Sequence, residues 1–200
     1  MIERDGDEQA RATSLVRYAP GSQFATHVHP MGEEILVLDG EFSDESGSYS
    51  AGNYLRNPPG SRHTPSSGPG CLLFVKLRHF HPMDSQPVRI DTRRTVWRPG
   101  LVPGLSVMPL AEFAADGRAE HTALVRWAPN TFFSSHRHWG GEEIFVIDGV
   151  FEDQYGRYPA GTWLRSPHLS EHQPFSRKGC TILVKTGHLP EVNPNQAAPG

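Results

Sequence analysis

The chain has 200 residues, with 19 lysines and arginines against 22 aspartates and glutamates, which gives a formal net charge of −3. That length suits one large domain or two small ones, and the charge argues against binding nucleic acid through a basic surface. No stretch approaches the roughly 18 apolar residues that a membrane span needs. The polar residues 1–14 hold no apolar signal-peptide core. We therefore expect a cytoplasmic protein that binds neither nucleic acid nor membrane.

The composition favours short strands over helices. The chain contains 20 glycines and 18 prolines, which are spread along its length, as is typical of many turns between short strands. Two cysteines, Cys71 and Cys180, are too few for a disulfide-stapled scaffold or a thiolate zinc cluster. Reactive thiols, extra ligands or a disulfide between them are open alternatives, but we favour small buried core residues.

The sequence is a tandem repeat. With a shift of 109 positions, residues 15–79 align with residues 124–188 without a gap, and about half of the aligned positions are identical. Such a match indicates two homologous domains. We place the first at residues 1–84 and the second at residues 85–200.

In chain order, the elements of each repeat are expected to be short strands. The first repeat has apolar, β-branched runs at 35–42 and 71–77, and the second has their counterparts at 144–151 and 180–186. Asp39-Gly40 and Asp148-Gly149 interrupt two of these runs and predict type I′ hairpin turns. Between the repeats, residues 84–120 are expected to supply one or two extra strands, with a helical turn at 110–116. The fold class is therefore all-β, with two small antiparallel barrels or jelly rolls.

The repeats differ in what precedes them. The first has few residues ahead of Ser14, whereas a Pro- and Gly-rich segment precedes the second. The first barrel is therefore either shorter or completed by part of residues 85–110.

Histidine and glutamate recur at the same spacing in both repeats. Two histidines in an H-x-H pattern would place both imidazoles on one face of a strand, because side chains alternate with period 2. A short loop then returns the chain to a glutamate, and a third histidine arrives from a distant strand. The residues are His27, His29, Glu33 and His63 in the first repeat and His136, His138, Glu142 and His172 in the second.

Three imidazoles and one carboxylate suit zinc, iron, manganese, nickel or copper better than calcium or magnesium. Surface histidines beside an acidic turn are the alternative, but the repetition of the spacing favours metal binding. We expect a divalent transition metal, zinc or iron first and manganese or nickel next, with up to two ions per chain. Glu34 and Glu143 compete as ligands, and strand alternation favours an outward or supporting role for them.

These residues carry a resemblance to the cupin superfamily, and specifically to a tandem bicupin. The pattern G-x5-H-x-H-x3-E-x6-G is met by Gly21, His27, His29, Glu33 and Gly40. The pattern G-x5-P-x-G-x2-H-x3-N is met by Gly52, Pro58, Gly60 and His63, with Ser67 at the asparagine position. The second repeat departs at Asn130, Leu169 and Ser176, none of which is an expected ligand.

Within the cupins, both repeats are similar to the cupin domain of ChrR-like anti-sigma factors. That resemblance implies a zinc- or iron-type metal held by the eight residues above. ChrR-like regulators hold the sigma factor with a separate helical, zinc-binding N-terminal domain, which residues 1–14 do not supply. Anti-sigma activity is therefore not expected of this chain.

Other charged positions leave alternatives open. Arg17 and Arg56, with their counterparts Arg126 and Arg165, could hold an anionic ligand inside a barrel or could be structural. Lys76 and Lys185 fit the structural interpretation better. Arg62 precedes a ligand histidine where the second repeat has Glu171. If both point toward the mouth of their site, an anionic ligand prefers the first site, and otherwise both are solvated rim residues.

Three functions are compatible with the sequence. The first is a metal-dependent enzyme, an oxygenase-type oxidoreductase acting on a small dicarbonyl, phenolic or carboxylate compound, since cupins include dioxygenases, decarboxylases and isomerases. The second is a non-enzymatic, ChrR-like metal sensor. The third is a sugar- or acid-binding barrel with a structural metal. The expected partner is a small-molecule ligand or substrate, and a homodimer is left open.

Overall fold

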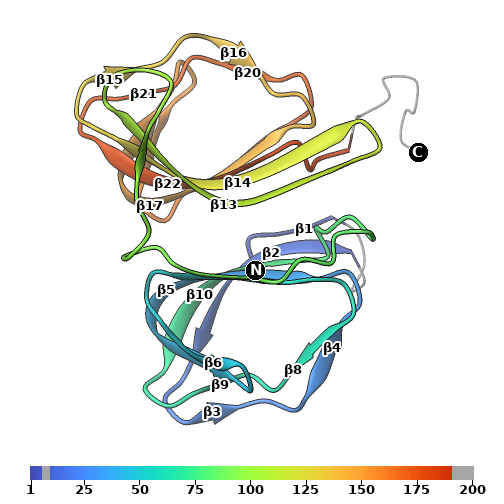
Figure 1. Ribbon diagram of the computed structural model, residues 1–200. Helices are drawn as coiled ribbons and strands as arrows, with labels where there is room; N and C mark the ends of the chain where they lie inside the picture. Colours follow the sequence, from blue (N-terminus) through green and yellow to red (C-terminus); the bar gives the residue numbers. More distant parts are fainter. Residues whose placement is uncertain (6–9, 191–200) are drawn as a thin grey trace, which may run out of the picture. The chain divides into compact units, whose positions relative to one another are not determined.

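The computed structural model describes residues 1–5 and 10–190 of the chain. These residues form strands and turns, and among them no helix is long and apolar enough to span a membrane. The chain divides into two compact units, Met1–Thr95 and Val96–Gly200. Each unit is a curled antiparallel sheet of the jelly-roll type (Figure 1). The all-β prediction is confirmed.

The first unit is built around a sheet with strand order β1-β2-β10-β5-β7-β11, and β4 and β8 form a separate pair. Figure 1 shows that pair across the barrel from β5 and β10. The strands are β1 (Glu3–Asp5), β2 (Arg11–Tyr18), β3 (Ser22–Gln23), β4 (His27–His29), β5 (Glu33–Asp44), β6 (Gly47–Ser50), β7 (Asn53–Asn57), β8 (Ser61–His63), β9 (Ser66–Ser67), β10 (Cys71–Leu77) and β11 (Val88–Asp91).

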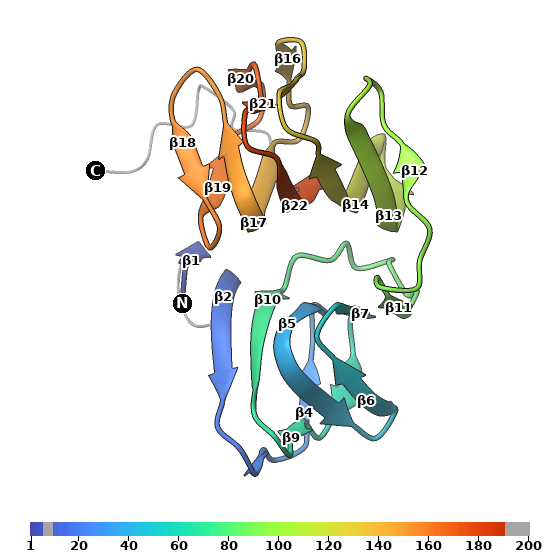
Figure 2. The same cartoon turned by 90° about the vertical axis from the view of Figure 1, so that its left-hand side faces the viewer.

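The second unit repeats this plan with strand order β12-β13-β14-β22-β17-β21-β15 and a separate β16–β20 pair. Figure 2 shows β13, β14, β22 and β17 side by side. The strands are β12 (Arg98–Pro99), β13 (Leu105–Ala115), β14 (Arg118–Trp127), β15 (Thr131–Phe132), β16 (His136–Arg137), β17 (Glu142–Glu152), β18 (Arg157–Pro159), β19 (Trp163–Ser166), β20 (Glu171–His172), β21 (Phe175–Ser176) and β22 (Cys180–Thr186).

The hairpin turns expected at Asp39-Gly40 and Asp148-Gly149 are wrong. β5 and β17 continue through these dipeptides without a chain reversal. The register against the neighbouring strand, β10 or β22, shifts by one residue just before each aspartate. Gly40 has a φ of +72°, and a Cβ there would lie 2.0 Å from the Gly70 carbonyl oxygen. Glycine is therefore needed for a β-bulge that bends one long strand, not for a chain reversal.

The helical turn expected at 110–116 is also wrong. Residues 105–115 form β13, which pairs along its length with β14. The turn between them is Asp116-Gly117, where both residues have positive φ, at +53° and +76°. The rule for Asp-Gly hairpins therefore applies at this dipeptide. Pairing of β13 with β14 overrides the weak helical tendency of the short apolar run at 110–116.

The segment between the repeats contributes to both units. β11 pairs with β7 of the first unit, so residues 85–110 do help to complete the first sheet. β13 instead covers the outer edge of β14 in the second unit. In the described part of the first unit, β1 reaches only Arg11–Thr13 of β2, and no strand lies along Ser14–Tyr18 on that edge.

Inward-facing side chains of each sheet form a separate core. In the first unit it includes Ile35, Val37, Phe42, Leu55 and Leu73, and in the second their counterparts recur at shifted positions. Cys71 and Cys180 are buried free thiols within these two cores. Burial raises the pKa of Cys180 to about 11, which suits the core role and opposes reactivity.

Candidate metal centres

The first cluster of histidines lies where β4 and β8 pair at one side of the first barrel. His27 stands opposite His63 in this ladder, and His29 lies one alternation further along β4. The following turn brings Glu33, the first residue of β5, back toward them. The structure therefore brings together the four residues that the spacing predicted for the first repeat.

Ligand atoms converge in this cluster. The Nε2 atoms of His29 and His63 lie 2.9 Å apart. Glu33 Oε2 lies 3.4 Å from His29 Nε2 and 3.6 Å from His63 Nε2. The Nδ1 atom of His27 faces the Ala25 carbonyl oxygen at 2.9 Å, which turns its other nitrogen toward the cluster.

The second cluster repeats this arrangement on β16, β17 and β20. His136 stands opposite His172 in the short ladder. Glu142 Oε2 lies 3.6 Å from the Nε2 atoms of both His138 and His172. Ligand atoms of all four residues lie within 4.8 Å of one another; in the first barrel, that criterion is met by the three histidines.

The donor set fits a divalent transition metal. Three imidazole nitrogens and one carboxylate oxygen match zinc or iron, and manganese or nickel next. Within the described residues, His138 Nε2 and Glu142 Oε2 are buried and have no hydrogen-bond partner. Buried polar atoms are normally satisfied, so these two atoms meet the expectation for a cation site. Each barrel could hold one ion.

Burial tunes the protonation of these groups. Burial, reinforced by the neighbouring histidines, lowers the pKa of His29 and of His138 to about 4. Both imidazoles are therefore neutral at physiological pH, as metal ligation requires. Burial also raises the pKa of Glu142 to about 8, with help from Asp153.

Sequence reasoning missed the aspartates behind the third histidine of each cluster. Asp44 Oδ2 lies 3.5 Å from His63 Nδ1, and Asp153 Oδ2 lies 3.5 Å from His172 Nδ1. A carboxylate behind the outer nitrogen of an imidazole orients the ring and favours the tautomer that ligates. The signal was available, because both repeats have aspartate at this position.

Glu34 points away from the first cluster, as strand alternation predicts. Its Oε1 accepts a hydrogen bond of 2.5 Å from the Tyr54 hydroxyl. In the second unit, Glu143 Oε1 likewise lies 3.4 Å from His188 Nε2. These two buried carboxylates belong to the other face of each sheet.

Five of the six paired cations do not line a barrel interior. Arg56 is buried beside Asp84, at 2.5 Å, with its guanidinium over the Phe80 ring. Arg17 and Arg126 are exposed. Lys76 and Lys185 are buried beside the hydroxyls of Thr13 and Thr122. The structural interpretation therefore holds for Arg56 and the two lysines.

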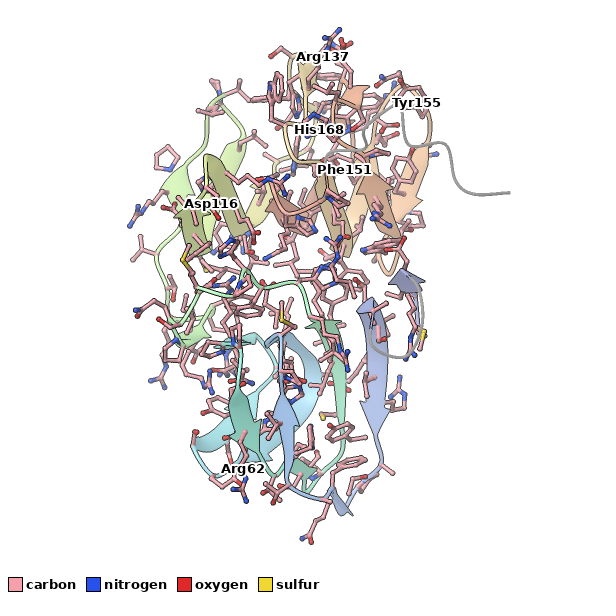
Figure 3. The ribbon with its side chains drawn as sticks, turned by 90° about the vertical axis from the view of Figure 1, so that its right-hand side faces the viewer. Arg62, Asp116, Arg137, Phe151, Tyr155 and His168 are labelled. Carbon is pink, nitrogen blue, oxygen red and sulfur yellow. The ribbon has the colours of Figure 1, made fainter. Side chains whose placement is uncertain are left out.

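Arg62 and Glu171 are exposed rim residues. Each precedes a buried histidine on its strand, so alternation turns it to the opposite side. Glu171 accepts hydrogen bonds from Arg137, at 3.0 Å, and Ser135, at 2.8 Å. Figure 3 shows Arg62 and Arg137 projecting outward. Arg62 nevertheless lines a pocket of about 240 Å³ together with His63, Asn57 and Arg89, so the reversed charge lies at this pocket and not among the converging ligand atoms.

An apolar cavity of about 170 Å³ adjoins the second cluster. His136, Glu142 and His172 contribute to its wall. The remaining wall is apolar, and it includes Leu105, Val107, Val125, Trp127, Ile182 and Val184. Leu105 and Val107 belong to β13, the strand that has no counterpart along Ser14–Tyr18 of β2 in the described part of the first unit.

The first barrel has different groups at the equivalent places. Tyr18 replaces Trp127 and packs on Phe24, with ring centroids 4.5 Å apart. Burial, with added repulsion from Glu33, raises the pKa of the Tyr18 phenol to about 12. A neutral hydroxyl therefore stands near the first cluster where the second has an indole.

Comparison with solved structures places the fold among cupins. A candidate dioxygenase from Nostoc punctiforme has a TM-score of 0.74 at 15% identity, covering 95% of this chain and 74% of that one. Salicylate 1,2-dioxygenase from Pseudaminobacter salicylatoxidans has a TM-score of 0.70 at 11% identity, with 88% and 70% coverage. Oxalate decarboxylase from Lactobacillus farciminis has a TM-score of 0.63 at 12% identity, with 89% and 77% coverage.

The family comparison covers both repeats. No curated protein sequence matches the chain. The model of the ChrR Cupin-like domain matches residues 1–81 and again residues 85–190. Because these segments span most of the sequence, the chain belongs to the ChrR Cupin-like domain family.

Proposed function

We propose that the protein is a metal-dependent, oxygenase-type enzyme acting on a small organic compound, and that the second barrel holds the reacting site. The observation that carries the proposal is the apolar cavity beside His136, Glu142 and His172. Dicarbonyl, phenolic and carboxylate compounds are the substrate classes considered, because each offers an oxygen atom to a metal.

The size of the cavity limits the substrate. A cavity of about 150 Å³ lined by apolar side chains binds a benzene-sized molecule, and this one is about 170 Å³. Among the described residues, the wall contains no lysine or arginine, so an anionic group would have no cationic side chain from them to pair with. These features favour the phenolic and dicarbonyl classes over a carboxylate.

The residues of the second barrel have distinct roles in this proposal. His136, His138, Glu142 and His172 would hold the metal, and Asp153 would orient His172. The apolar wall from β13, β14 and β22 would position the substrate body and keep bulk water from it. An iron ion, when bound, would supply redox chemistry with O₂, and zinc would supply Lewis-acid polarisation alone.

Membership of the ChrR Cupin-like family favours a second candidate, a metal-binding sensor without catalytic activity. In that case the metal would be stoichiometric zinc in a closed coordination sphere. Metal identity and an open coordination position therefore separate the two candidates.

The test is oxygen consumption by protein loaded with iron(II), measured with a panel of monocyclic phenols, β-dicarbonyls and small carboxylates. We expect uptake with a phenol or a β-dicarbonyl, and none from zinc-loaded protein. Full iron loading without oxygen uptake on any member of the panel would overturn the enzyme proposal and leave the sensor.

A further inference from the structure

The carboxylate of the first cluster is held by a neighbour that the second cluster lacks. Glu33 and Asn57 are direct cross-strand partners on β5 and β7. Asn57 Nδ2 donates a hydrogen bond of 3.1 Å to Glu33 Oε2. That oxygen is also the one nearest His29 and His63, at 3.4 Å and 3.6 Å. Both side chains are buried, with 5% and 7% of the residue exposed for Asn57 and Glu33.

This hydrogen bond selects one geometry for the carboxylate. A carboxylate oxygen has two lone pairs. The Asn57 amide takes one of them, which leaves the other directed toward the imidazoles. Glu33 is therefore constrained both in which oxygen faces the cluster and in how that oxygen is turned.

Arg89 fixes the Asn57 amide in turn. Arg89 Nη2 donates a hydrogen bond of 2.6 Å to Asn57 Oδ1. The amide oxygen must therefore face Arg89, and the NH₂ group must face Glu33. The guanidinium is itself held by the Arg56 carbonyl, at 3.0 Å, and by the Tyr49 hydroxyl, at 3.2 Å.

Arg89 comes from β11, which lies outside the aligned part of the repeats. The relay from Arg89 through Asn57 to Glu33 is therefore an addition to the first barrel, not a property of the duplicated unit.

The second barrel has a serine at the matching position. Glu142 pairs across strands with Ser166, in the register that joins Glu33 to Asn57. A serine is shorter and has no amide. Glu142 Oε2 is buried and has no hydrogen-bond partner among the described residues. Within the described part of the chain, no equivalent donor therefore holds the Glu142 carboxylate.

We infer that Asn57 and Arg89 are positioning residues that lock Glu33 as a fixed ligand, so that the first barrel retains its metal and the second exchanges a coordination position. The inference rests on the proposal that both clusters hold metal, but it does not depend on the reaction. Groups that orient a metal ligand typically change metal affinity by about 10- to 100-fold when removed.

The test uses cobalt(II) as the probe in full-length protein with one site disabled. His138→Ala with His172→Ala isolates the first site, and His29→Ala with His63→Ala isolates the second. In the first background, Asn57→Ser and the similarly sized Asn57→Leu should each lower cobalt affinity by about 10- to 100-fold. Arg89→Met should lower it less, because Asn57 is still present.

The visible absorption spectrum of bound cobalt reports the number and geometry of its ligands directly. A change in packing alone would not alter that spectrum. We expect the Asn57→Ser spectrum of the first site to move toward that of the native second site. Ser166→Ala is the matched control and should leave the second site unchanged in affinity and spectrum.

The possible results separate the two proposals. If neither barrel binds cobalt, the metal-dependent function fails. If both bind, and the Asn57 and Arg89 variants retain the affinity and spectrum of the first site, the positioning role alone is overturned. Thermal melting of the metal-free variants identifies any loss of folding, and Arg89→Met then provides the test with Asn57 intact.

Discussion

The two barrels have the same candidate ligands at the same spacing, but those ligands have different surroundings. The first barrel anchors its carboxylate through Asn57, and Tyr18 lies near the cluster. The second has Ser166 and Trp127 at those positions, together with an apolar cavity to whose wall β13 contributes. The two units therefore keep the candidate ligands in corresponding places, while the neighbouring strands differ. The difference favours a retaining site in the first barrel and a reacting site in the second.

The most direct way to break this comparison is to remove one cluster at a time. His63→Ala and His172→Ala should each reduce the metal content from two ions per chain to one, because each deletes one ligand of one site. Oxygen uptake should fall at least about 100-fold in His172→Ala and much less in His63→Ala. Elemental analysis and an oxygen electrode measure the two quantities. Equal losses of uptake in the two variants would contradict the division of roles.

Filling the cavity tests the difference between the barrels without changing any candidate metal ligand. Val125→Phe places a ring in the cavity wall and should weaken binding of a monocyclic phenol by at least about 10-fold, because the space of one ring is lost. Calorimetry on zinc-loaded protein measures this binding apart from turnover.

Val16→Phe is the matched control, at the equivalent position of the first barrel. It should leave phenol binding unchanged, and metal content should remain two ions per chain in both variants. Equal weakening by the two substitutions would show that the cavity is not the binding site.

Much of this arrangement could be predicted from the sequence, for identifiable reasons. The candidate ligand histidines lie on short strands and obey alternation, and the repeat distinguishes them from other histidines. Asn57 and Arg89 could not be found in this way. Asn57 and its counterpart Ser166 are different residues, so a search for positions that are identical in the two repeats does not find Asn57. Arg89 lies outside the repeat.

The prediction of hairpin turns at Asp39-Gly40 and Asp148-Gly149 failed for a different reason. Asp39-Gly40 has the local chemistry of a hairpin turn, and only the partner strand β10 decides that the chain continues. The cavity depends on β13, whose pairing with β14 is equally a matter of tertiary structure. Local patterns therefore predicted which side chains gather in each cluster, and predicted the surroundings of the clusters poorly.

Two adjacent glutamates sharpen the assignment of ligands. Glu33→Gln should lower metal affinity of the first site by at least about 10-fold, because a neutral amide is a much poorer ligand than a carboxylate. Glu34→Gln should change it less than about 3-fold, since Glu34 bonds Tyr54 instead. Glu142→Gln and Glu143→Gln should show the same order in the second site. A reversed order in chelator competition would assign the ligand role to the other carboxylate.

The smallest expected effect concerns the stability of metal-free protein against pH. Glu142 has its pKa raised from 4.5 to about 8 by burial. The folded state therefore binds its proton more tightly than the unfolded state does. The stability gained in this way is complete below about pH 4.5 and is lost as pH rises through 8. His138, with its pKa lowered from 6.5 to about 4, acts in the opposite direction only below about pH 6.5.

Between about pH 6.5 and 8, Glu142 should therefore lower the melting temperature of chelator-treated protein as pH rises, in the same direction as Glu33 and His63, whose pKa values are also raised. Glu142→Gln removes the ionisation and should flatten this dependence, with a gain of several °C at pH 8, since about 1 kcal/mol shifts the melting temperature by ~2–4 °C at this size. Glu33→Gln should flatten it less, because His63 and the Asn57 amide oppose the effect of burial on the pKa of Glu33. Equal flattening by the two variants would mean that the two carboxylates have equivalent environments, and would remove the electrostatic side of the contrast between the barrels.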